Sequence, residues 1–150
     1  MIRVQTEPFD PHAEAAAFSR GRGEAGALAT FVGSVRASAH GGMVYSLELE
    51  AYPGFTEKQI AQIETDARAR FDIIDTLVVH RCGRMAPGEA IVFVAALSRH
   101  RRAALEAVDY LMDRLKTEAP FWKKELGPDG EEWIEPRADD KEAHARWDKT

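Results

Sequence analysis

Residues 73–97, IIDTLVVHRCGRMAPGEAIVFVAAL, place two apolar runs on either side of a turn. The runs Ile73–His80 and Ala90–Leu97 are rich in β-branched residues, which pack well on the pleated surface of a sheet. Between them, Met85–Gly88 contains the proline and glycine that typically mark a turn. The segment therefore predicts two neighbouring antiparallel strands, with a connection longer than the two-residue loop of a tight hairpin.

Helices are expected both before and after this pair of strands in the sequence. The helix that follows is expected to begin after Ser98, a suitable cap, and to end before Pro120, which disfavours helical geometry at the preceding residue. Its apolar stripe has helical spacing and consists of Ala104 or Leu105, Val108, Leu111 or Met112, and Leu115. A short helix over His12–Ser19 is capped by Asp10. Another helix has the stripe Ile60, Ile63, Ala67 and Phe71, before which Thr56 and Gln59 resemble a capping box.

Further strands determine the fold class. They are expected over Ile2–Thr6, Gly26–Val35, Met43–Ala51, Phe121–Glu125 and Glu132–Glu135, whereas residues 37–42 are expected to form a loop. Since the strands outnumber the helices and several can form hairpins, the sequence predicts an α+β fold with a mostly antiparallel sheet and packed helices. We expect a single α+β domain over residues 1–136 and a charged C-terminal tail over residues 137–150.

Composition excludes several classes of protein. The 150 residues carry a net charge of −5 and lack the basic excess of most nucleic-acid-binding domains. No apolar stretch approaches the roughly 20 residues that span a bilayer, and the N-terminus lacks the apolar core of a signal peptide, so a cytoplasmic protein is expected. Cys82, the single cysteine, cannot form a disulfide within the chain, and no His, Cys, Asp and Glu set has metal-binding spacing.

Two lysines stand near the end of the third helix, in the run LKTEAPFWKKE, residues 115–125. Lys116 belongs to the last helical turn and Lys123 to the extended segment after it, so their ammonium groups can converge from two elements. Like charges repel, and an anionic ligand would offset that repulsion. A partly closed pocket walled by Phe121 or Trp122 would lower the pKa of a lysine. The alternatives are a contact with the helix dipole for Lys116 and a solvated strand position for Lys123.

A basic cluster marks the start of the same helix. Arg99–Arg102 surrounds a helix N-terminus, whose unpaired N–H groups and positive dipole end favour an anion such as phosphate. The alternative is a set of arginines that face solvent. Arg36 follows a glycine near a strand end, where a functional side chain can lie beside a close backbone approach, and its alternative is a surface arginine.

Three other polar residues carry weaker signals. His80, which ends an apolar strand, is interpreted as a structural hydrogen-bonding group, although it could titrate. Cys82 has no clear activating neighbour in the sequence and is interpreted as a buried small side chain. Glu125 could pair with a lysine and hold Lys123 in place, or it could be a solvated charge.

The motifs, in their order, resemble those of one family, the large, catalytic subunits of molybdopterin synthase. The shared segments are TFVGSVR (30–36), LELEAYPGFTEK (47–58), HRCG (80–83), PGE (87–89), His100-Arg101, LKT (115–117) and PFWKKE (120–125). Each motif alone is weak, but the ordered set is highly specific. The chain departs from the family pattern at Ala51, Phe55 and Leu105, which are interpreted as packing changes, and in the loop 37–42, to which no substrate contact is assigned.

The resemblance implies an α/β-hammerhead fold and a sulfurtransferase reaction. The family converts cyclic pyranopterin monophosphate to molybdopterin by inserting two sulfurs as a dithiolene. The sulfur arrives on a small ubiquitin-like partner that ends in a Gly-Gly thiocarboxylate. The large subunit is expected as a homodimer within a heterotetramer, with no metal or organic cofactor for this step and with no nucleic-acid or membrane partner.

The family pattern also implies roles for individual residues. Lys116 and Lys123 take the positions of the catalytic lysines. Lys116 would orient or transiently hold the thiocarboxylate carbon, and Lys123 would act on protons or on developing negative charge at the pterin side chain. The implied phosphate-binding residues are Arg36, His100 and Arg101. Arg137 would add to the pocket across the dimer interface, and Glu125 and Phe121 would support the geometry of the lysines.

Two other functions fit the same residues. One is a different group transfer on a phosphorylated heterocycle. The other is a binding module whose sheet edge and basic cluster hold an acidic partner tail by strand addition. Which lysine acts first, and whether a covalent acyl intermediate forms, are questions that the residue pattern leaves open.

Overall fold

The computed structural model describes residues 1–39, 41–135 and 138–149. Its α-helices are α1 (Pro11–Ser19), α2 (Phe55–Arg70), α3 (Arg101–Glu118) and α4 (Ala138–Ala145), and the 3-10 helix η1 (Arg146–Lys149) follows α4. Its strands are β1 (Ile2–Gln5), β2 (Ala27–Ser34), β3 (Ser38–Ala39), β4 (Gly42–Met43), β5 (Ser46–Ala51), β6 (Asp75–Arg81), β7 (Gly83–Met85), β8 (Ala90–Ser98), β9 (Phe121–Gly127) and β10 (Gly130–Ile134). No helix in these residues is long and apolar enough to cross a membrane.

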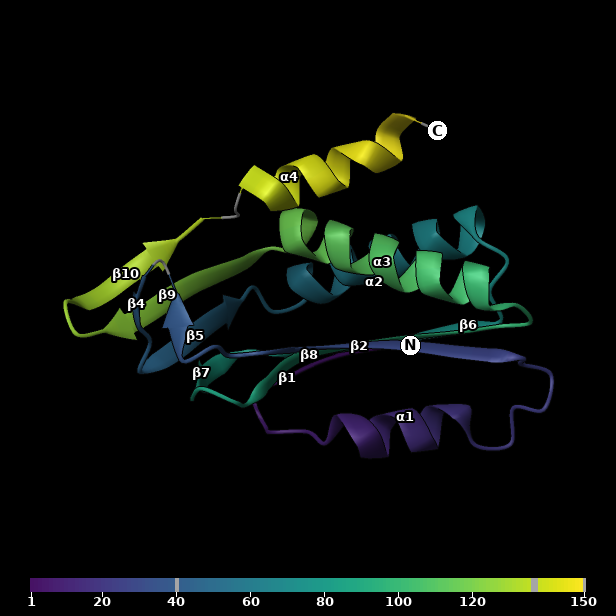
Figure 1. Ribbon diagram of the computed structural model, residues 1–150, viewed down its shortest axis with the longest axis horizontal. Helices are drawn as coiled ribbons and strands as arrows, with labels where there is room; N and C mark the ends of the chain where they lie inside the picture. Colours follow the sequence, from purple (N-terminus) through teal and green to yellow (C-terminus); the bar gives the residue numbers. More distant parts are fainter. Residues whose placement is uncertain (40, 136–137, 150) are drawn as a thin grey trace.

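The larger sheet has four strands in the order β1-β6-β8-β2 (Figure 1). β1 and β6 are parallel, and the other two pairs are antiparallel, which confirms the pair of strands expected over residues 73–97. Val78 and Val94 belong to the core beneath α2 and α3, whereas Leu77 and Phe93 belong to the core beneath α1. Because helices cover both faces of the sheet, β6 and β8 are apolar on both faces, which explains their continuous apolar runs.

The helix α2 begins earlier than the sequence predicts. Its N-cap is Gly54, with φ 81°, a conformation that favours glycine. The N–H of Gly54 donates to Glu57 Oε2 at 2.8 Å. Thr56 is buried, and its hydroxyl donates to the carbonyl of Pro120 at 3.1 Å. The expected capping box of Thr56 and Gln59 is therefore wrong, because the side chain of Thr56 instead contacts Pro120, just after the C-terminal end of α3.

The start of α3 differs from the prediction in a similar way. The N-cap is His100, and Ser98 lies two residues before it. Ser98 Oγ accepts from the N–H of His100 at 3.2 Å and donates to the carbonyl of Asp72 at 2.8 Å, so it links the helix start to the loop after α2. The predicted stripe is buried where it passes through Ala104, and the alternative member Leu105 is 60% exposed.

The second sheet lies at one end of the larger one and has the order β10-β9-β5-β7 (Figure 1). All its pairs are antiparallel, and the predicted strands around residues 127–130 form the β9–β10 hairpin. Its small core consists of Val35, Val44, Leu47, Leu49 and Met85. The strand expected over Met43–Ala51 is interrupted, and the loop expected over residues 37–42 contains β3 and part of β4. These strands of two residues carry too little pattern to be predicted, because their pairing alone defines them.

The C-terminal residues 138–149 run along α3 (Figure 1). The ring of Trp147 meets those of Phe71 and Tyr110 edge-on, with centroid distances of 5.9 and 5.4 Å. Trp147 Nε1 donates to Asp113 Oδ2 at 2.6 Å, and Arg146 pairs with the same oxygen at 2.8 Å. The described part of the segment that the sequence indicates as a charged tail is therefore helical and anchored at its far end.

Candidate active site

A cavity of about 330 Å³ lies where the second sheet meets the C-terminal part of α3 and the end of β2. Its apolar lining includes Phe31, Leu49, Val92, Met112 and Phe121. Its polar lining includes Arg36, His80, Lys116, Lys123 and Glu125. Within the described residues, no group of three or more His, Cys, Asp or Glu side chains could hold a metal ion. The cavity thus gathers three cationic side chains from separate parts of the chain.

Lys116 reaches this cavity from the last turn of α3. Leu115 beside it is buried in the main core, and its carbonyl accepts from the N–H of Ala119 at 3.3 Å. Pro120 then ends the helix, and its carbonyl accepts from the hydroxyl of Thr56 on α2. Packing before Lys116 and a hydrogen bond after it therefore determine where the helix end presents its ammonium group.

Lys123 reaches the cavity from β9. Side chains alternate along this strand, and Phe121, Lys123 and Glu125 share the face that lines the cavity. Lys123 lies opposite Leu49 of β5 on one side and Ile134 of β10 on the other. Its Nζ is 3.8 Å from Glu125 Oε1. The structure therefore brings Lys116 and Lys123 from two elements to one cavity, here called the lysine cavity. Glu125 lies beside Lys123.

The two lysines affect each other electrostatically. Burial lowers the pKa of Lys123 below its ordinary value, and the charge of Lys116 lowers this pKa further. The carboxylate of Glu125 opposes both effects. A lowered pKa increases the fraction of neutral amine near neutral pH, so Lys123 can accept a proton as well as donate one.

Arg36 lies just beyond β2, at the same cavity. The register of β2 against β8 shifts between Gly33 and Ser34, an irregularity that redirects a strand end. The following Val35 is held by its N–H, which donates to the carbonyl of Glu89 at 2.9 Å. Arg36 therefore offers the cavity a planar set of donors that suits phosphate or carboxylate.

His80 also lines the cavity. The sequence alone does not place this residue in the site. Its ring stacks on Phe121, with centroids 4.0 Å apart and an interplanar angle of 18°. Burial lowers the pKa of His80 to about 4, and the charge of Lys116 also lowers it. The imidazole is therefore neutral near neutral pH. The stacking joins β6 to β9 in the other sheet, so no local motif could have predicted it.

Cys82 is not among the described residues that line this cavity. It is half-buried, not buried as the sequence indicates, and its Sγ is 3.7 Å from the carbonyl oxygen of Gln5. Burial, and then the charges of Glu57 and Glu7, raise the pKa of the thiol. Since the thiolate is the reactive form, Cys82 is a poor nucleophile near neutral pH.

Comparison with known proteins assigns these residues to a family. Residues 4–118 match the family model described as MoaE protein. The chain is 53% identical over 149 residues to the molybdopterin synthase catalytic subunit of Caulobacter vibrioides, a match that covers 99% of this chain and 98% of that one. The chain belongs to the MoaE family.

Solved structures of MoaE proteins have the same fold. The MoaE protein of Burkholderia ambifaria matches with a TM-score of 0.84 at 48% identity, over 99% of this chain and 97% of that one. The molybdopterin synthase of Staphylococcus aureus matches with a TM-score of 0.80 at 33% identity, over 87% of this chain and 94% of that chain. The expected α+β class with mostly antiparallel sheets is confirmed.

His100 and Arg101, which the MoaE resemblance associates with phosphate, lie at the other end of α3 from the lysine cavity. An α-helix rises about 1.5 Å per residue, so roughly 22 Å separate Arg101 from Lys116 along the axis. Neither residue is among those described as lining the cavity. The length of α3 thus keeps them away from Arg36 within one chain. Arg137 lies outside the described residues.

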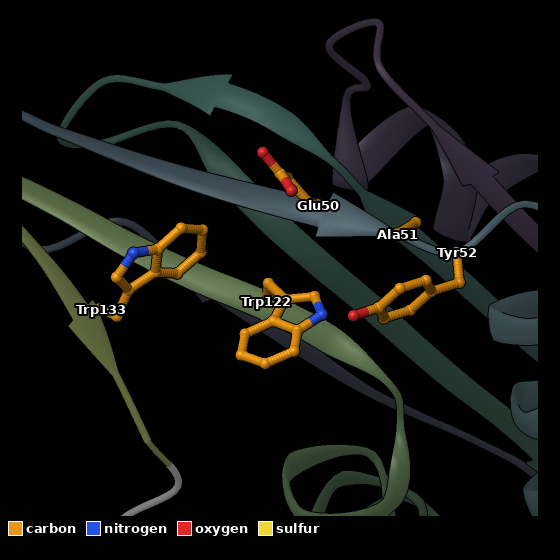
Figure 2. Close-up of a pocket in the computed structure, with 5 residues that line it drawn as sticks. All are labelled: Glu50, Ala51, Tyr52, Trp122 and Trp133. Carbon is orange, nitrogen blue, oxygen red and sulfur yellow. The ribbon is translucent and has the colours of Figure 1, made fainter.

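The outer face of the second sheet carries a row of aromatic side chains (Figure 2). Trp122 meets Tyr52 and Trp133 edge-on, with centroid distances of 6.5 and 5.8 Å. Lys124 Nζ lies 4.5 Å from the centre of the Trp133 ring. In this MoaE chain, Phe121 and not Trp122 therefore walls the lysine cavity, and Lys124 is a lysine of the same strand on the opposite face.

Proposed function

We propose that the chain is the catalytic subunit of a molybdopterin synthase. It transfers sulfur from the C-terminal thiocarboxylate of a small ubiquitin-like partner to cyclic pyranopterin monophosphate, and so forms the dithiolene of molybdopterin. The observation that carries this proposal is the cavity shared by Lys116 and Lys123, in a chain whose relatives are molybdopterin synthase catalytic subunits. The proposal includes a cytoplasmic location and a reaction without a metal or organic cofactor.

The cavity suits the proposed reactants. Thiocarboxylate and phosphate are anions, for which Arg36, Lys116 and Lys123 supply cationic donors. Phe31 and Phe121 supply apolar wall for a pterin ring. Sulfur that arrives on a partner requires no reactive thiol on the enzyme, which agrees with the chemistry of the single cysteine.

The two lysines have different roles in this proposal. Lys116, at the helix end, orients the thiocarboxylate and can hold its carbon transiently. Lys123, with its lowered pKa, exchanges protons with the pterin side chain and stabilises negative charge there. Glu125 holds Lys123 in place. In each transfer, sulfur replaces an oxygen on the pterin side chain, the carbon–sulfur bond of the carrier breaks, and the carrier carboxylate gains an oxygen from water. One dithiolene therefore consumes two carriers.

The proposed homodimer has a suitable surface at the edge of the larger sheet. Among the described residues, β2 pairs with β8 on one side and leaves its other edge open. Leu28, Phe31 and Val32 on this strand are 40–42% exposed. Antiparallel pairing of β2 with its copy, about a two-fold axis near the strand centre, would join the two sheets and cover these side chains.

This pairing would also complete the proposed phosphate site. The start of one β2 would lie beside the end of the other, which leads to Arg36. The N–H of Gly26, just before β2, donates to the carbonyl of Ser98 at 3.0 Å, so the start of α3 lies close by. We therefore assign His100 and Arg101 of one protomer to the cavity of the other.

Reconstitution tests the proposed function. The purified chain is mixed with a thiocarboxylated small subunit and cyclic pyranopterin monophosphate, and molybdopterin is measured by chromatography. We expect product from the complete mixture and none when the small subunit ends in an ordinary carboxylate. Failure of the complete mixture, or product without the thiocarboxylate, would contradict the proposal.

Arginine substitutions separate this function from a binding module. Lys116→Arg and Lys123→Arg keep the positive charge but replace an amine that can deprotonate. We expect both variants to bind the small subunit and to form little product. Product formation at the wild-type rate would favour a module in which only charge matters.

A further inference from the structure

His80 is held rigidly at the wall of the lysine cavity. It lies near the end of β6, opposite Val92 of β8, and is only 8% exposed. Its ring stacks on Phe121 at the start of β9. Nδ1 lies 2.9 Å from the carbonyl oxygen of Arg81. These contacts restrict both the position and the rotation of the imidazole.

The contact with Arg81 determines the tautomer. A carbonyl oxygen accepts hydrogen bonds and cannot donate them, so Nδ1 must carry the hydrogen. Because burial keeps the ring neutral near neutral pH, Nε2 retains its lone pair and can only accept. Glu135 and Asp140 also line the cavity. Within the described residues, however, no group donates a hydrogen bond to Nε2, and no acceptor or carboxylate lies within pairing distance of the ammonium group of Lys116.

We propose that His80 is a positioning residue: when the carrier tail is bound, Nε2 accepts a hydrogen bond from the Nζ of Lys116 and so directs this amine towards the incoming acyl carbon. Both side chains line the same cavity, and the charge of Lys116 acts on the imidazole. This assignment rests on the proposed function, because it concerns the same reaction.

A neutral acceptor suits this task better than a carboxylate. A carboxylate beside Lys116 would cancel its positive charge and repel the anionic thiocarboxylate. An imidazole that stays neutral orients the amine and leaves its charge available. Lys123 has the opposite arrangement, with Glu125 at 3.8 Å. With His80 as its acceptor, Lys116 would keep its charge for an anionic acyl carrier. Lys123, which has a carboxylate beside it, suits proton exchange.

Three substitutions of His80 distinguish positioning from a structural role. H80Q places an amide oxygen near the position of Nε2 and loses the Nδ1 donor. H80N keeps a donor near the position of Nδ1 and loses the acceptor. H80F keeps the ring against Phe121 and loses both polar atoms. Each variant is assayed for kcat and for the KM of the precursor with the thiocarboxylated small subunit, and for Tm.

We expect H80N and H80F to lose kcat by about tenfold to a hundredfold with little change in KM, the effect of one lost hydrogen bond to a charged group. H80Q should retain kcat within about threefold of the wild type, because it keeps the acceptor. Wild-type turnover by H80N or H80F would overturn the assignment, as would an H80Q variant that loses as much kcat as H80N. If H80F does not fold, the comparison of H80Q with H80N decides.

A wild-type protein that forms no product would contradict the proposed function, whereas failure of the His80 assignment alone leaves the wild type active.

Discussion

Lys116 and Lys123 show how one type of side chain acquires different properties from its surroundings. Lys116 is exposed at the end of a helix, whereas Lys123 lies on a strand between two others, and its pKa is lowered by burial and by Lys116. The carboxylate of Glu125 limits this decrease. The chemistry of the cavity therefore depends on a balance between desolvation, a like charge and an opposite charge.

Removal of the Glu125 charge should shift the pH dependence of the reaction. Glu125 raises the pKa of Lys123, so E125Q should lower this pKa further. If Lys123 must accept a proton, the acidic limb of the rate–pH profile should move to lower pH, measured under single-turnover conditions. E131Q, which removes the partner of Lys124 at 3.5 Å, is the matched control and should leave the limb in place. A shift to higher pH in E125Q would contradict the role of Lys123.

Replacement of Lys123 by an apolar side chain should stabilise the protein while it abolishes activity. The folded-state pKa of Lys123 lies below its unfolded value, so the unfolded chain binds more protons between these two values and the wild-type stability rises with pH through that window. At pH values below this window both states carry the charge, so partial burial of the ammonium group reduces stability there. K123M should therefore raise Tm most below the window, and the gain should become smaller as the pH rises through it. K124M, on the opposite face, should show no such gain, and a lower Tm for K123M than for the wild type would contradict this balance.

The sequence predicted the convergence of the two lysines but not the surroundings of His80. A helix that ends at Pro120, followed by an alternating strand, limits where Lys116 and Lys123 can point, and this information is local. The stacking of His80 on Phe121 instead depends on how two sheets meet. The separation of Arg101 from Arg36 within one chain also depends on the fold, because it follows from the length and direction of α3. The family pattern, in addition, does not reveal which protomer supplies a residue.

At the scale of elements, long and strongly patterned segments were predictable and short ones were not. The apolar runs of β6 and β8 and the stripe of α3 are confirmed. β7 and the β3–β4 ribbon were missed because they contain two or three residues each and depend on pairing. The caps of α2 and α3 were misplaced because Thr56 and Ser98 bond to Pro120 and Asp72, which are distant in the sequence.

The attachment of the C-terminal segment should depend on Trp147. Its ring packs against Phe71 and Tyr110 and its Nε1 bonds to Asp113, so W147A should lower the free energy of unfolding by about 1–3 kcal/mol. Residues 138–149 should also be cleaved faster in limited proteolysis. W122A is the control, because Trp122 lies on the solvent-facing side of β9 and is 53% exposed. Equal effects of the two substitutions would contradict the anchoring role of Trp147.

At the scale of the whole molecule, the proposed homodimer would divide the site between two chains. The cavity holds Arg36, Lys116 and Lys123, whereas His100 and Arg101 lie at the opposite end of α3. In the proposed dimer, pairing of the exposed β2 edges about a two-fold axis would bring these ends together. In this arrangement, dimerisation buries apolar side chains and completes the anion-binding site at once.

Mixed dimers test this division. Arg101→Ala and Lys116→Ala chains, each nearly inactive alone, are co-expressed with different tags. If Arg101 acts in the other protomer, one of the two sites in each mixed dimer is intact, and random pairing should restore about a quarter of the wild-type activity. A mixture of Lys116→Ala and Lys123→Ala chains is the control and should restore none, because both lysines line one cavity. No recovery in the first mixture would place Arg101 in the site of its own chain or outside any site.

Single-turnover sulfur transfer by three lysine variants examines the lysine cavity itself. Lys116→Ala, Lys123→Ala and Lys124→Ala proteins, each shown to be folded, are mixed with thiocarboxylated small subunit and cyclic pyranopterin monophosphate. Because Lys124 faces away on the same strand, its variant should form molybdopterin at the wild-type rate, whereas the other two should be slower by about a hundredfold or more. Wild-type turnover by Lys116→Ala or Lys123→Ala, or an equal loss in all three, would contradict a reaction carried out by these two amines.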